Sequence, residues 1–187
     1  MSGPGRSTPA AARRLAVVLF ITTLAAAARP SPAWLLAGAI VAGIGEALRL
    51  WASGYLVKTE ILITAGPYAR TRNPLYLGRL LLLTGTGLAA TLPHHLNFAV
   101  LAGGLALFFI YYLPRKERVE GDRLRLKHGA LYEAYRAAVP ALYPSFRRYD
   151  ALHVPWSFAL MARNRELVVL AGLVVLFSLL AHRAAGG

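Results

Sequence analysis

Long apolar runs separated by basic segments are the feature that most constrains the fold of this chain. Of its 187 residues, 57% are hydrophobic, and the run at 96–113 carries no charged residue. A helix needs about 20 consecutive apolar residues to cross the hydrocarbon core of a bilayer. A soluble domain of this length has no need of several such runs. We therefore predict a multi-pass membrane protein.

Five membrane spans fit the pattern, at 13–30, 33–57, 75–92, 96–113 and 165–183. They predict an all-α transmembrane bundle that forms a single membrane domain, with a further cytoplasmic helical segment at 114–164. The first run resembles a secretory signal peptide, because Arg13 and Arg14 precede it and small residues end it. Because further apolar runs follow, we expect it to remain as an uncleaved first span.

The positive charge is distributed unevenly along the chain. Its 21 Lys and Arg outnumber its 8 Asp and Glu, which gives a net charge of +13. Ten of the basic residues fall in 114–164, whereas the turn at 93–95 has none. Basic loops mark the cytoplasmic face and attract anionic lipid headgroups. We therefore place the N-terminus, 58–74 and 114–164 in the cytoplasm, and expect membrane lipids rather than nucleic acid as partners.

Metal and thiol chemistry have no basis in the sequence. The chain contains no cysteine, which excludes disulfides, thiolate metal sites and a cysteine nucleophile. His94 and His95 are adjacent in a polar turn and do not have the spacing of zinc ligands. We predict no metal site, and the sequence does not specify an oligomeric state.

Several charged residues fall inside or beside the spans and require partners. Glu46 and Arg49 are three residues apart on the second span, so they can neutralise each other on one helix face. Alternatively, Glu46 pairs with Arg79 of the third span. The charges at 163–166 begin the last span, and the sequence assigns them no task beyond anchoring at the membrane interface.

Two polar segments are candidates for a functional site. The first, 65–78, is rich in Gly and Pro and lies between two apolar runs, where irregular backbone needs shelter from protein or water. The second lies in 114–164, where six residues share one helical stripe if the helix is continuous: Glu117, Glu120, Leu124, His128, Leu131 and Tyr135. Gly129 can end one helix and start another within this stripe.

Together the two segments resemble the integral-membrane methyltransferases of the isoprenylcysteine carboxyl methyltransferase and phospholipid methyltransferase type, which use S-adenosylmethionine. The resemblance covers roughly residues 46–144. It rests on Gly66, Pro67, Tyr68, the run from Arg72 through Asn73, Pro74, Leu75, Tyr76 and Leu77 to Gly78, and then Glu120, Gly129, Tyr132, Tyr135, Val139, Pro140 and Pro144. Asn73 stands where the carboxyl methyltransferases usually have His. An Asn at this position resembles the phospholipid methyltransferase variant instead. Gly121 stands where a second Glu is common in the family.

The resemblance implies a set of site residues. The cofactor-binding residues would be Tyr68, Asn73, Pro74, Tyr76, Gly78, Glu120, Tyr132 and Tyr135. Arg72 and Glu120 would be catalytic: Arg72 would hold a carboxylate or phosphate of the substrate, and Glu120 would bind the ammonium group of the cofactor. Methyl transfer from a sulfonium depends more on alignment than on an acid or base. The substrate would be a lipid or lipophilic small molecule that arrives from the bilayer, with a carboxylate, amine or phenol as the acceptor.

Two other functions are compatible with the sequence. The polar C-terminal region is also distantly similar to steroid-reductase-type enzymes, which would make the chain an NADPH-dependent membrane reductase. A non-enzymatic lipid-binding or scaffold protein is the third possibility. Considered without the resemblance, Arg72 is typical of an interface anchor and Glu120 of a surface ion pair.

Overall fold

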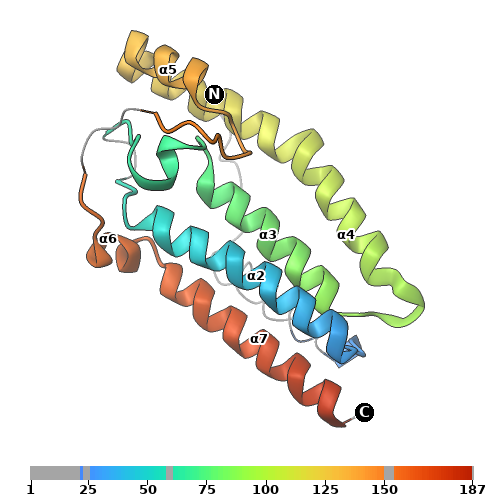
Figure 1. The fold of residues 1–187 in the computed structure, drawn as a ribbon. Coiled ribbons are helices and arrows are strands. Elements are labelled where there is room, and N and C mark those ends of the chain that lie inside the picture. The colour runs from blue at the N-terminus through green and yellow to red at the C-terminus, as the bar shows by residue number, and fades with distance from the viewer. Residues whose placement is uncertain (1–21, 23–25, 58–60, 150–153, 187) are drawn as a thin grey trace, which may run out of the picture.

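The computed structural model describes residues 22, 26–57, 61–149 and 154–186, and throughout these ranges the regular structure is helical. The elements are α2 (Pro32–Ser53), η1 (Gly66–Ala69), α3 (Pro74–Ala89), η2 (Pro93–His95), α4 (Leu96–Leu107), the π-helix η3 (Phe108–Tyr112), α5 (Leu113–Ala138), α6 (Phe158–Arg163) and α7 (Glu166–Gly186). Figure 1 shows four long helices side by side in the order α7, α2, α3, α4. The predicted all-α class is confirmed.

Three helical stretches are long and apolar enough to cross a membrane: α2, α7, and Pro93–Ala138, which contains α4 and α5 and has its uncharged run at 96–113. They coincide with the second, fifth and fourth predicted spans, and the protein is a helical membrane protein. The third predicted span coincides with α3, whose 16 residues fall short of the usual spanning length of about 20. Most of the first predicted span, 13–30, lies outside the described residues.

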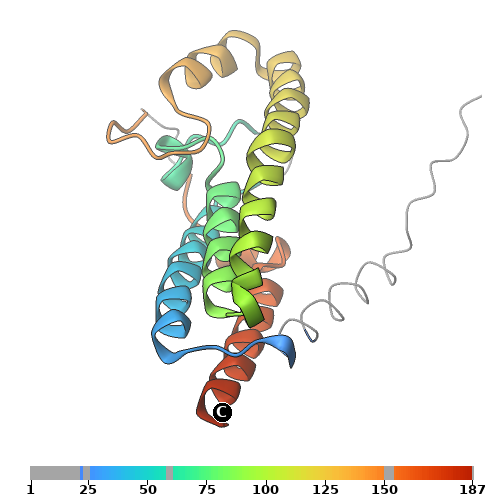
Figure 2. The same ribbon diagram turned by 90° about the vertical axis from the view of Figure 1, so that its right-hand side faces the viewer.

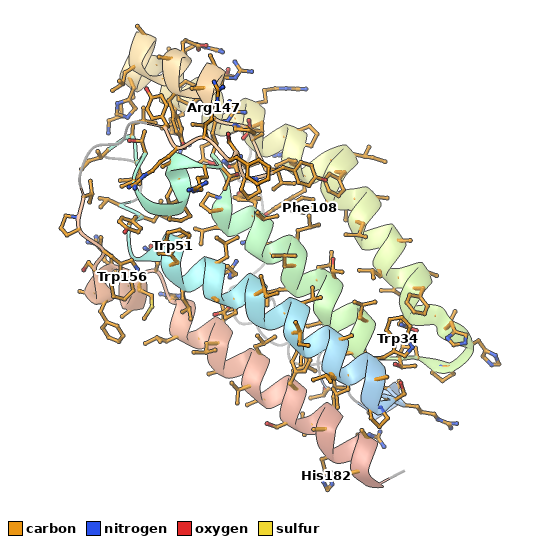
Figure 3. The ribbon with its side chains drawn as sticks, in the orientation of Figure 1. Trp34, Trp51, Phe108, Arg147, Trp156 and His182 are labelled. Carbon is orange, nitrogen blue, oxygen red and sulfur yellow. The ribbon has the colours of Figure 1, made fainter. Side chains whose placement is uncertain are left out.

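Tryptophans mark both ends of the bundle. Trp51 and Trp156 lie toward one end, while Trp34 lies toward the other (Figure 3). Their exposed fractions are 47%, 42% and 44%, respectively. Trp is enriched at the two membrane–water interfaces, where its amphipathic ring meets both headgroups and hydrocarbon. The positions of these side chains therefore agree with a bundle that lies across a bilayer.

Small residues bring α2 and α3 into close contact. A Cβ atom added to Gly45 would lie 2.8 Å from the carbonyl oxygen of Gly78, and one added to Gly85 would lie 2.5 Å from the backbone nitrogen of Ala42. Small residues that allow the backbones to approach are typical of helix pairs in membranes. This contact aligns the start of α3, which carries the first candidate segment, with the end of α2.

Gly129 breaks the long helix α5. Its φ of 51° and ψ of −126° are not helical, and this conformation favours glycine because it has no side chain. After the kink, the chain folds back over the end of the bundle (Figure 2). The predicted break at Gly129 is therefore present, and the single stripe, which required a continuous helix, does not extend beyond this point. Tyr132 and Tyr135 are buried, whereas Leu131 is 54% exposed.

The charges inside the spans form a cluster between α2 and α7. Arg49 Nε lies 3.5 Å from Glu46 Oε2, so the predicted pairing of these two residues is present. Arg49 Nη2 also donates to Glu166 Oε2 at 2.6 Å, which provides a role for one of the charges at the start of the last span. Arg79 donates to the hydroxyl of Tyr112 at 2.5 Å, so its partner is not Glu46.

Candidate functional site

Hydrogen bonds join the two segments that the sequence singled out. The backbone nitrogen of Arg72 donates to the carbonyl of Pro140 at 2.9 Å, and the nitrogen of Tyr149 donates to the carbonyl of Ala69 at 2.9 Å. The loop after α5 therefore follows the turn between η1 and α3. The two segments, which are distant in the sequence, therefore meet in the structure.

The side chain of Arg72 is fixed by α5. Its Nη2 donates to Glu117 Oε2 at 2.6 Å, and its Nη1 donates to the carbonyl of Arg136 at 3.1 Å. The side chain is only 12% exposed. Its Nε is buried and has no hydrogen-bond partner among the described residues. Of the five N–H donors of the guanidinium, these two contacts use two, so the group is held in place while other donors remain unused.

Asn73 connects three parts of the site. Its Nδ2 donates to Glu117 Oε1 at 2.5 Å and to the carbonyl of Ala141 at 2.8 Å. Its Oδ1 accepts a hydrogen bond from the ammonium of Lys116. The residue is 2% exposed. These partners set the orientation of the amide, because both of its ends meet groups of fixed hydrogen-bond character.

Glu117 and Lys116 also belong to the candidate site, although neither was among the predicted binding or catalytic residues. Glu117 binds both Arg72 and Asn73, and Lys116 lies 2.8 Å from Glu120 Oε2. Glu117 belongs to the predicted stripe that contains Glu120, and this shared face was the available signal. Nothing in the sequence showed which residues it would meet across the bundle.

A hydrogen bond joins tyrosines of the two segments. The hydroxyl of Tyr135 donates to the carbonyl of Tyr68 at 2.8 Å. Burial raises the pKa of both Tyr68 and Tyr135 above the ordinary value for a phenol. The pKa of Tyr132 is also raised by burial, although nearby Arg72 acts in the opposite direction. These hydroxyls are therefore protonated at neutral pH.

Three cavities surround these side chains. The loop cavity, of about 110 Å³, is lined by Tyr68, Arg72, Glu117, Glu120, Tyr132 and Tyr135, together with apolar residues before η1. The helix cavity, of about 530 Å³, lies among α2, α3, α5 and α7. The outer cavity, of about 390 Å³, lies between Tyr76, Tyr112 and the first turns of α5. Arg72, Glu120 and Tyr68 line both the loop cavity and the helix cavity.

The remaining predicted residues divide into two groups. Asn73 and Tyr76 line the helix cavity. Pro74 and Gly78 line none of the three cavities and lie in the packing of α3, where a Cβ on Gly78 would lie 2.4 Å from the side chain of Arg49. The structure therefore gives Pro74 and Gly78 a helix-packing environment, while the other predicted residues face a cavity.

The helix cavity carries an excess of positive charge. Its ionisable lining consists of Arg49, Arg72, Arg79, Lys116 and Arg165 against Glu120 and Glu166, apart from tyrosines. A cleft lined by one sign of charge raises the local concentration of ligands of the opposite sign. The cavity is thus suited to an anionic or zwitterionic group. Arg165 and Glu166, which had no predicted task, both line it.

Part of the chain is similar to a known metal-resistance protein. No protein-family model matches the chain, and no solved structure matches it significantly. Over 121 residues, or 64% of the chain, it is 32% identical to the cobalt-zinc-cadmium resistance protein CzcN of Cupriavidus metallidurans. The aligned part is 53% of that protein, so the chain spans about half the length of this relative.

Proposed function

We propose that this protein is an integral-membrane, S-adenosylmethionine-dependent methyltransferase that acts on a lipid or lipophilic small molecule. The observation that carries the proposal is the shared lining of the loop and helix cavities. Arg72 comes from the segment before α3, Glu120 comes from α5, and both line both cavities. These are the two residues to which the family resemblance assigns the central roles.

The size of the helix cavity and two groups in its lining support this cofactor class. Its volume of about 530 Å³ falls within the range of about 300–1,000 Å³ usual for small-molecule sites. The carboxylate of Glu120 suits an ammonium group, and the ring of Tyr76 suits a cation on its face. When bound, the cofactor supplies an activated methyl group on a sulfonium.

The residues of the chain would bind and orient the reactants. Arg72, held by Glu117, would bind an anionic group of the substrate through N–H groups that its contacts with Glu117 and Arg136 leave unused. The apolar surfaces of α2 and α7 would guide a lipophilic substrate from the bilayer. Fixed alignment would supply much of the rate. We place this end of the bundle in the cytoplasm, because the basic residues of 114–164 lie there.

Cofactor binding to the purified protein tests the proposal. We expect isothermal titration with S-adenosylmethionine to show binding, and we expect membranes incubated with the methyl-labelled cofactor to yield a labelled lipid. Arg72→Ala and Glu120→Ala should abolish labelling. Arg118→Ala, which removes an exposed cation of α5 outside the three cavities, should leave it unchanged.

The outcomes distinguish the three functions. Absence of cofactor binding to the folded protein would refute the methyltransferase proposal. Binding of NADPH in its place would support a membrane reductase. Cellular function that survives both Arg72→Ala and Glu120→Ala would support a non-enzymatic lipid-binding protein.

The similarity to CzcN favours a second, separate proposal, that the protein contributes to tolerance of heavy metals. Deleting the chain from its host should then lower growth in cobalt, zinc or cadmium. Complementation with Arg72→Ala would show whether this contribution depends on the candidate site. Equal growth of the deleted and intact strains in all three metals would contradict it.

A further inference from the structure

Lys116 lies where the three cavities meet. Lys116 and Glu120 line the loop, helix and outer cavities alike. The side chain of Lys116 is 14% exposed, and its Nζ lies 2.8 Å from Glu120 Oε2. This ion pair therefore stands at the junction of the spaces that a ligand would occupy.

The ammonium of Lys116 is surrounded by groups suited to an organic cation. Besides the carboxylate of Glu120, it donates to Asn73 Oδ1 and lies 5.0 Å from the centre of the Tyr76 ring. A carboxylate, an amide oxygen and an aromatic face together form a recognised environment for ammonium and sulfonium ligands. The site that would bind a cationic ligand is thus filled by a cation of the protein itself.

We infer that Lys116 is an internal competitor for the cation site formed by Glu120, Asn73 and Tyr76. The inference rests on the proposed function, because S-adenosylmethionine carries both an ammonium and a sulfonium that would need these groups. Lys116 has a flexible four-carbon side chain, so its ammonium can leave without movement of the backbone of α5. Its departure would also open the junction between the cavities.

Competition and direct recognition by Lys116 predict opposite changes in ligand affinity when its charge is removed. If Lys116 blocks the site, removing its charge must strengthen the binding of a cationic ligand. If Lys116 instead binds the carboxylate of the cofactor, removing its charge must weaken binding. The sign of the change in Kd therefore separates competition from direct recognition.

Lys116→Met tests this, because it keeps an unbranched side chain and removes the charge. We expect the Kd of labelled S-adenosylmethionine for the full chain in nanodiscs to fall roughly fivefold. This is the gain in affinity expected when the ligand no longer has to displace a modest ion pair. Lys116→Gln should give the same result. The matched control is Arg118→Gln, which removes one exposed positive charge from the same helix and should leave the Kd unchanged.

An unchanged or higher Kd in both Lys116 variants, with wild-type binding intact, would overturn the inference and leave the proposed function standing. Failure of the wild-type protein and all variants to bind the cofactor would overturn both. Thermal unfolding of each variant, measured in parallel, identifies any that fails to fold. Lys116→Arg is a further control. It retains the competing charge, so this variant should not bind the cofactor more tightly than the wild-type protein does.

Discussion

The carboxylate of Glu117 lies 2.6 Å from the guanidinium of Arg72, and this ion pair joins α5 to the turn that begins α3. The other carboxylate oxygen of Glu117 accepts a hydrogen bond from Asn73 at 2.5 Å. One acidic side chain therefore holds two adjacent residues of the candidate site. Its importance to the fold and to the site can be measured separately.

Glu117→Ala should destabilise the protein and impair the site. Loss of the carboxylate leaves Arg72 and Asn73 without their shared partner, at a cost of about 1–3 kcal/mol in the free energy of unfolding. The partial exposure of the Glu117 side chain, 23%, keeps the cost at this level. A double-mutant cycle with Arg72→Met, followed by denaturant unfolding in mixed micelles, should show a coupling energy. Additive effects would mean that the pair contributes little.

Arg49→Met should be among the most destabilising substitutions in the chain. It removes the counter-charge of Glu46 and Glu166, which are both buried, and breaking a buried pair in this way costs about 3–5 kcal/mol. The measurement is the free energy of unfolding in detergent. Arg79→Met is the matched control, because Arg79 donates to the neutral hydroxyl of Tyr112, and this substitution should cost less. Equal losses for the two variants would contradict the assigned role of Arg49.

The membrane fold was predictable from the sequence, because run length and charge decide which segments can cross a bilayer. The partners of the charged residues were less accessible. Glu46 and Arg49 are close in sequence, and their pairing was predicted. Glu166 joins them only because α7 packs beside α2. Glu117 meets Arg72 because the start of α5 lies beside the turn before α3. Such contacts depend on the arrangement and rotation of whole helices, which local patterns do not specify.

The glycines of the α2–α3 contact provide a third prediction. Gly85→Ala places a Cβ 2.5 Å from the backbone nitrogen of Ala42, so the helices must separate, at a cost of about 1–3 kcal/mol. Gly43→Ala is the matched control, since nothing lies within 4 Å of its added Cβ. It should be neutral or should stabilise α2 by up to about 1 kcal/mol. Thermal unfolding of both variants tests this, and equal melting temperatures would argue against the close contact.

Alkaline pH should destabilise the candidate site through its buried tyrosines. Burial raises the pKa of Tyr68 and Tyr135 in the folded protein, whereas a tyrosine in the unfolded chain keeps a pKa of about 10. Below this pH both states hold the proton, and the full stability is present. Above it the unfolded state loses protons first, so the free energy of unfolding should fall by up to about 1.4 kcal/mol per pH unit for each tyrosine.

Tyr135→Phe should reduce this slope by the contribution of one tyrosine. It should also lower the free energy of unfolding by about 1 kcal/mol at neutral pH, because the hydrogen bond to the Tyr68 carbonyl is lost. Tyr143→Phe is the control, since this side chain is 67% exposed and its removal should leave the slope unchanged. Denaturant unfolding between pH 8 and about 11 measures the slopes, and identical slopes for all three proteins would show that Tyr135 is not sealed from solvent in the folded protein.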